Sequence, residues 1–173
     1  IIFLLIFGFF AQNQMQAAAK VAFVDTDYIL SQMPEYLTAQ KKLNTIAEEW
    51  QKEAAKKQEE IQRLYKEYQA EELILTEQQK KIRQDVIVKK EAELRTFQND
   101  KFGYEGALFK KRQELIKPIQ DKVFNAIQII SKKNAFDIVI DKAGGNALLF
   151  ANPKYDISGE VLEELGIASK QVE

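Results

Sequence analysis

Residues 136–165 read FDIVIDKAGGNALLFANPKYDISGEVLEEL. In the first six of them, Phe136, Ile138 and Ile140 share one face, which is the alternation of a β-strand. A second apolar run over 146–151 follows a loop of four residues that contains two glycines. The two runs therefore predict a β-hairpin.

The remainder of this segment predicts a short terminal helix. Pro153 ends strand pairing, Ser158 is a suitable N-cap, and Gly166 is a suitable C-terminal stop. Much earlier in the chain, KVAFVD at 20–25 alternates like the first run of the hairpin, so it predicts a further strand.

These elements predict a small body formed by residues 20–34 and 119–173. Its strands and helices amount to only about 60 to 70 residues, close to the lower limit for a self-sufficient core. A sheet of three short strands also exposes hydrogen-bonding edges. We therefore expect oligomerisation through the body, and the pattern leaves the number of subunits open. The residues expected in this oligomerisation body are apolar: Val21, Phe23, Phe136, Ile138, Ile140, Leu148 and Phe150.

Residues 35–118 predict a long antiparallel helical hairpin, so we expect an α+β fold in which a coiled-coil arm projects from the body. Pro34 separates a short helix over 28–33 from the first long helix. From 51 to 72 only seven of 22 residues are apolar, so the seam of the arm is thin. Two series spaced by sevens define this seam, and the first is interrupted by Lys57 and Glu71: Tyr36, Leu43, Trp50 and Leu64, and Ala47, Ala54, Ile61, Tyr68 and Leu75.

The tip of the arm is predicted at 73–76, where three apolar residues precede Thr76. Thr76 and Gln79 have the spacing of a capping box that starts the returning helix. Along that helix we expect a break or kink at the FGYEG segment, 102–106, because glycine costs roughly 1 kcal/mol in a helix relative to alanine. Pro118 predicts a second one.

The charges divide between the two halves of the arm. Residues 35–79 carry seven basic and ten acidic side chains, whereas residues 80–134 carry 14 and seven. Opposite signs favour antiparallel pairing of the two halves, although each exposed ion pair contributes only about 0.2 to 1 kcal/mol.

The first residues, IIFLLIFGFFA at 1–11, are apolar and are followed by a polar segment and by Ala17, Ala18 and Ala19. Eleven helical residues rise roughly 16 Å, about half the hydrocarbon thickness of a bilayer, so a spanning anchor is the weaker interpretation. The pattern predicts a signal peptide over 1–19 that is truncated at its start, with cleavage before Lys20 and export from the cytoplasm.

The composition excludes several chemistries. The chain has no histidine and no cysteine, which removes imidazole and thiol catalysis and the usual zinc ligands. Gly144 and Gly145 lack the Lys-Ser/Thr of a phosphate loop. A net charge of −1 predicts no overall affinity for nucleic acid. No motif predicts a catalytic residue, a cofactor or a metal.

Two charged groups allow a functional alternative. Asp25, Asp137 and Asp141 lie at or near strands, where solvated or capping roles are favoured over a carboxylate pair or a metal site. Lys110, Lys111 and Arg112 form the densest basic run. A solvated helix face is favoured there, and the alternative is contact with phosphate groups of lipid or nucleic acid, including weak contact with a membrane surface.

Six aromatic residues lie along arms that are otherwise rich in Lys, Glu and Gln. One interpretation is that they pack between the two arms, and the other is that some contact apolar clients; both can hold for different rings. These client-contact candidates are Trp50, Tyr65, Tyr68, Phe97, Phe102 and Tyr104.

Taken together, the leader, the first strand KVAFVD, the charged helical hairpin and the 136–165 segment resemble the Skp/OmpH family of periplasmic chaperones. Asp156-Ile157-Ser158 is similar to the Asp-Ile-Ser/Thr entry of that family's last helix. The chain departs from the strongly basic members of the family, since its pI is near 5.8, so no lipopolysaccharide site is transferred.

The resemblance implies a homotrimer joined through its β-body, with three arms around a cavity that holds unfolded outer-membrane proteins without ATP. It implies the periplasm of a Gram-negative bacterium and a protein that is not an enzyme. The alternative function is a structural or adaptor coiled-coil protein of the cell envelope that binds one folded partner through its arms.

Overall fold

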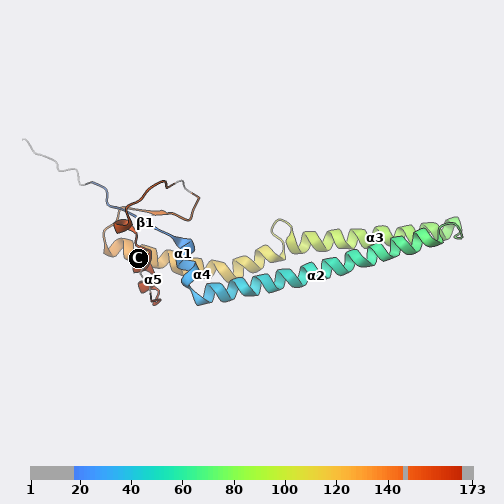
Figure 1. Ribbon diagram of the computed structural model, residues 1–173, viewed down its shortest axis with the longest axis horizontal. Helices are drawn as coiled ribbons and strands as arrows, with labels where there is room; N and C mark the ends of the chain where they lie inside the picture. Colours follow the sequence, from blue (N-terminus) through green and yellow to red (C-terminus); the bar gives the residue numbers. More distant parts are fainter. Residues whose placement is uncertain (1–17, 146–147, 169–173) are drawn as a thin grey trace, which may run out of the picture.

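The computed structural model describes residues 18–145 and 148–168. A long helical arm projects from a small body that contains both ends of the described chain (Figure 1). The predicted signal peptide lies outside the described residues except for Ala18 and Ala19. The elements follow in this order: β1 (Val21–Val24), α1 (Thr26–Gln32), α2 (Pro34–Glu71), α3 (Glu77–Phe102), α4 (Ala107–Lys133), β2 (Ile138–Asp141), the 3₁₀ turn η1 (Pro153–Tyr155) and α5 (Ser158–Glu164).

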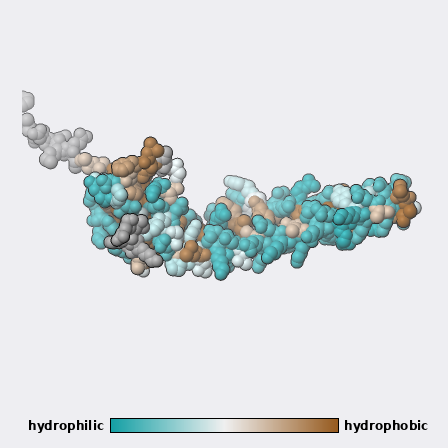
Figure 2. Space-filling model, viewed as in Figure 1, coloured by the Kyte–Doolittle hydropathy of each residue, from teal (hydrophilic) through white to brown (hydrophobic). Residues whose placement is uncertain are grey.

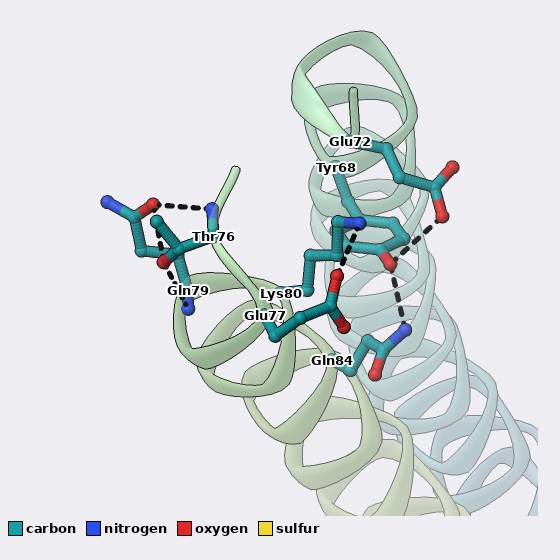
Figure 3. Close-up of polar contacts among 7 residues, drawn as sticks. All are labelled: Tyr68, Glu72, Thr76, Glu77, Gln79, Lys80 and Gln84. Carbon is teal, nitrogen blue, oxygen red and sulfur yellow. Dashed lines mark hydrogen bonds and ion pairs between the residues drawn. The ribbon is translucent and has the colours of Figure 1, made fainter. Parts of the chain in front are cut away.

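The arm confirms the predicted helical hairpin. Helix α2 has 38 residues, which is about 57 Å of straight helix, and Pro34 begins it at a position where proline needs no backbone donor. The chain reverses between α2 and α3, and Thr76 caps α3. The Thr76 side chain accepts from the Gln79 backbone, and the Gln79 side chain accepts from the Thr76 backbone nitrogen at 2.9 Å, which is the predicted capping box (Figure 3).

The returning half is broken once. Helix α3 ends at Phe102 and α4 begins at Ala107, so the break predicted at FGYEG is confirmed. Glu105 adopts a φ of 54°, and a Cβ on Gly103 would lie 2.4 Å from the Asn99 carbonyl oxygen. The loop therefore requires a residue without a side chain at position 103.

Of the break or kink expected at Pro118, the break is wrong, because α4 continues through this residue as one helix. Ile116 and Ile119 on either side are buried in the core. Packing of this apolar face offsets the single hydrogen bond that proline removes.

The predicted hairpin is also wrong. Strand β2 pairs in parallel with β1, in the register Val21 to Ile138 and Val24 to Asp141. Within the described part of 146–151, residues 148–151 form no strand. The partner of β2 is β1, which lies far away in the sequence.

The chain after η1 returns to the opposite side of β1. Asp156 bridges to Phe23, and the backbone nitrogen of Ile157 donates to the Phe23 carbonyl at 3.0 Å. Ser158 is not the N-cap that we predicted: it is the first residue of α5, and its hydroxyl accepts from the Asp25 backbone nitrogen at 2.9 Å. Gly166, with a φ of 73°, follows the end of α5 as expected.

One core joins the body to the base of the arm. It contains residues of β1, α1, α2, α4 and α5, with Ile29, Val161 and Leu162 fully buried. Ala39 and Leu43 of α2 belong to the same core, so the arm is anchored through its first turns. None of the helices in the described ranges is long and apolar enough to cross a membrane.

Candidate functional site

The seam between α2 and α3 is thin, as the sequence predicts. Beyond Leu43, only Ile61 on α2 is buried, and its counterparts on α3 are Ile87 and Leu94. Little apolar area therefore holds the outer arm together.

Ion pairs between the two halves follow the predicted charge division. Glu60 pairs with Lys90 at 3.0 Å, and Glu71 pairs with Arg83 at 3.1 Å. Nearer the body, Glu35 pairs with Lys122 at 2.6 Å. In each pair the acid comes from α2 and the base from the returning half. The Lys90 ammonium lowers the pKa of Glu60 below 4.5 through its hydrogen bond and charge, and Glu60 raises the pKa of Lys90.

Three of the six aromatic candidates form a cluster at mid-arm. The Trp50 and Phe102 rings meet edge to face with centroids 6.2 Å apart. The Lys101 ammonium lies 4.7 Å from the centre of the Trp50 ring and 5.6 Å from that of Phe97. Lys57 approaches Phe97 at 5.4 Å. The cluster thus combines aromatic faces with ammonium groups just before the break.

Tyr65 and Tyr68 make polar contacts across the arm. The Tyr65 hydroxyl donates to Glu91 of α3 at 3.0 Å, and this hydrogen bond raises the pKa of Tyr65. The Tyr68 hydroxyl donates to Glu72 at 3.2 Å and accepts from Gln84 at 2.8 Å (Figure 3). The sixth candidate, Tyr104, is 98% exposed in the break loop. Five of the candidates therefore have partners within the arm, and Tyr104 presents its whole ring to solvent.

The tip carries an apolar surface that sequence reasoning did not select as a candidate. Leu73 and Ile74 are 98% and 83% exposed, and Figure 2 shows the apolar patch at the free end of the arm. Ile82 and Val86 on α3 are also exposed. The LIL sequence before Thr76 could have indicated this surface. Apolar residues in the turn between two helices lie on no helix face that could bury them.

Five of the seven predicted body residues line an open groove of about 600 Å³. Val21, Phe23, Ile140, Leu148 and Phe150 line it together with Ala18 and Tyr155. Many of these side chains are exposed, and Figure 2 shows apolar residues gathered on this part of the body. Of the other predicted body residues, Ile138 is half exposed, and Phe136 packs against the core.

The three strand-end aspartates have structural roles, as favoured. Asp25 caps α1, and Asp137 accepts from the Lys20 backbone nitrogen at 2.7 Å. Asp141 accepts from both the backbone nitrogen and the hydroxyl of Thr26. In the basic run, Lys111 pairs with Glu114 at 2.7 Å on the exposed surface of α4.

Known proteins share this architecture and part of the sequence. The family model of outer membrane proteins of the OmpH-like type matches residues 20–165. The chaperone protein Skp of Yersinia enterocolitica is 27% identical over 152 residues, which cover 86% of this chain and 87% of the relative. An uncharacterized protein of Aquifex aeolicus (strain VF5) is 31% identical over 144 residues, with 83% and 84% covered. The crystal structure of an OmpH-like protein from Caulobacter crescentus CB15 shares the fold, with a TM-score of 0.67, 13% identity, and 91% and 90% of the two chains covered.

Proposed function

The chain belongs to the OmpH-like family of outer membrane proteins, and on that premise we propose that it is an ATP-independent periplasmic chaperone. It binds unfolded outer-membrane proteins between its helical arms and prevents their aggregation on the way to the outer membrane. The similarity to a chaperone protein Skp over most of both chains supports this role. No catalytic activity is part of the proposal.

The observation that carries the proposal is the outer arm, a long and thinly packed hairpin that exposes apolar side chains. Leu73 and Ile74 at the tip and Tyr104 at the break present apolar surface at two positions along a highly charged element. Isolated apolar groups of this kind offer weak contacts to an extended apolar chain, while the surrounding charges keep the complex in solution. Trp50, Tyr65, Tyr68, Phe97 and Phe102 become available when the two halves of the arm separate locally.

The body supports a homotrimer in this proposal. Its apolar groove and the exposed Ile138, Leu149 and Phe150 form a surface that a single chain leaves uncovered. Burial of such a surface between subunits provides a hydrophobic core that a body of this size lacks by itself. Three arms then project from one end and enclose the client.

Electrostatics contribute to client capture. The returning half of the arm carries a net charge of plus seven over residues 80–134, whereas the outgoing half carries minus three over 35–79. A basic returning half attracts acidic segments of the client at long range and loses part of this attraction at high salt.

The test is light scattering after dilution of a urea-unfolded outer-membrane β-barrel protein into buffer that contains residues 20–173 and no ATP. We expect aggregation to be suppressed at one trimer per client, and we expect no complex with the same β-barrel protein after it has folded. A soluble coiled-coil protein of matched charge serves as the control for nonspecific crowding.

Two outcomes contradict the proposal. Unchanged aggregation in the presence of a folded trimer rules out holding of unfolded clients. Binding to one folded envelope protein together with no binding to unfolded ones supports the envelope adaptor instead.

A further inference from the structure

Lys20 is held to the body by contacts from its backbone and its side chain. Its backbone nitrogen donates to a carboxylate oxygen of Asp137 at 2.7 Å, and its carbonyl accepts from the Asp137 nitrogen at 2.8 Å. Its ammonium group donates to the Asn134 carbonyl at 2.6 Å and lies 4.8 Å from the centre of the Phe136 ring. Strand β1 begins at the next residue, so these contacts fasten its start to the segment that leads into β2.

The residues just before Lys20 differ from it. Ala18 and Ala19 are exposed and belong to no helix or strand. They also form the end of the Ala-x-Ala pattern that predicts cleavage between Ala19 and Lys20. The amide bond predicted to be cut is therefore the one whose nitrogen donates to Asp137.

We propose that removal of the leader at Ala19 creates an ammonium group on Lys20 that forms an ion pair with Asp137 and locks β1 onto β2 in the mature protein. A leader peptidase uses one water molecule to hydrolyse the amide: Ala19 leaves as a carboxylate, and the Lys20 nitrogen becomes an amine that takes up a proton. Before cleavage this nitrogen is a neutral donor with one hydrogen. After cleavage it is a charged donor, and charge-assisted hydrogen bonds are roughly twice as strong as neutral ones.

The Asp137 carboxylate is available to the backbone nitrogen of Lys20 without competition from the Lys20 side chain. The side-chain ammonium of Lys20 is directed to the Asn134 carbonyl, so the two positive groups of Lys20 have separate acceptors. Asn134 is itself fixed, because its side-chain amide donates to Glu160 of α5 at 2.7 Å. The new charge thus forms in a site whose acceptor is already in position.

The test is a double-mutant cycle on four proteins. Two chains begin with a free amino terminus at Lys20, and two begin at Ala18; one of each carries Asp137→Asn. Each is released from a fusion by a protease that leaves the intended first residue, and all are unfolded in urea at one protein concentration. The pH is 6.5, below the usual α-amino pKa of about 7.7 to 8.0.

We expect the chain that begins at Lys20 to have an unfolding equilibrium constant about two- to fivefold lower than the chain that begins at Ala18, as for an exposed ion pair. The difference disappears with Asp137→Asn, which keeps a neutral acceptor. Acetylation of the Lys20 amino terminus reproduces the loss. As a matched control, Asp85→Asn removes an exposed carboxylate from α3 and leaves the difference intact.

The proposal is overturned if the chains that begin at Lys20 and at Ala18 are equally stable. It is equally overturned if their difference persists with Asp137→Asn, because the effect then arises from chain length and not from the ion pair. The result is independent of client binding, which these measurements do not involve.

Discussion

Trp50 in the middle of α2 and Phe102, the last residue of α3, meet edge to face with ring centroids 6.2 Å apart. This contact ties the end of α3 to the unbroken helix α2 just before the chain leaves helical geometry. The end of α3 is therefore held against α2, and the loop of residues 103–106 begins at this contact.

Replacement of Phe102 by alanine is expected to lower the free energy of unfolding by about 1 to 2 kcal/mol, because it removes an edge-to-face pair and part of the arm packing. Urea denaturation measures the effect. Tyr104→Ala provides the matched control, since this ring is 98% exposed and its removal should leave stability within about 0.5 kcal/mol. Equal losses in the two variants would argue against the role given to the ring pair.

The break is expected to open more readily than the helices on either side. Residues 103–106 form no regular helix, and Glu105 has an unfavourable φ of 54°. We predict a local maximum of backbone hydrogen exchange at Gly103 to Gly106, measured by NMR or mass spectrometry. Protection as uniform as that of α3 and α4 would show that the loop is not a hinge.

The ion pair between Glu60 and Lys90 predicts an acid-sensitive contact in the outer arm. Lys90 holds the pKa of Glu60 below its ordinary value, so the pair contributes stability above the ordinary pKa and loses it as the pH falls through the lowered one. An NMR titration should place the Glu60 midpoint below that of an ordinary exposed glutamate, and Lys90→Gln should raise it toward the ordinary value. Lys89→Gln changes a neighbouring exposed lysine and should leave the Glu60 midpoint where it is.

Asp141 is expected to be a stability determinant of the body. Its carboxylate accepts from the Thr26 backbone nitrogen at 3.2 Å, from the Thr26 hydroxyl at 2.7 Å and from the Ala143 backbone nitrogen at 3.0 Å. Asp141→Ala should reduce the free energy of unfolding by about 2 to 3 kcal/mol, because these donors lose their partner. Asp121→Ala breaks only an exposed pair with Lys117 and should cost less than about 1 kcal/mol. Thermal unfolding of the two variants and of the unaltered protein measures both losses of stability.

The tip is expected to matter for client binding and not for folding. Leu73→Ser combined with Ile74→Ser alters two side chains that are 98% and 83% exposed, so the melting temperature should not change. Partial burial of each side chain against a client is worth about 1 kcal/mol, so affinity of the double variant for an unfolded β-barrel protein should fall about 30-fold. Affinity measured by fluorescence quenching tests this, and undiminished binding would exclude the tip from the client site.

Local patterns predicted the arm and parts of the body. The thin seam, the capping box at Thr76, the break at FGYEG and the opposite charges of the two halves each depend on neighbouring residues in the sequence. The pairing of β2 was not predictable in this way. A glycine-containing loop after an alternating run favours a hairpin, yet the partner of Ile138 is Val21, which precedes the whole arm in the sequence.

The remaining errors arise from tertiary contacts. Pro118 lies between core residues whose packing keeps α4 continuous, and helix propensity takes no account of such packing. Ser158 has the residue type of an N-cap, but the donor it satisfies is the Asp25 nitrogen, from the other end of the chain. The apolar run at the tip can be read from the sequence. Its exposure cannot, because the run has no periodicity that distinguishes a binding surface from a buried segment.

The parallel pairing of β1 with β2 also closes a very long loop of the chain. Lys20 and Asp137 are 117 positions apart, and every residue of α2, α3 and α4 lies between them. The hairpin can therefore fold first from contacts that are local around its turn, and in doing so it carries the two ends of the chain together. Closing so long a loop by diffusion alone would be slow. Formation of the arm thus shortens the search by which the two strands at its base meet.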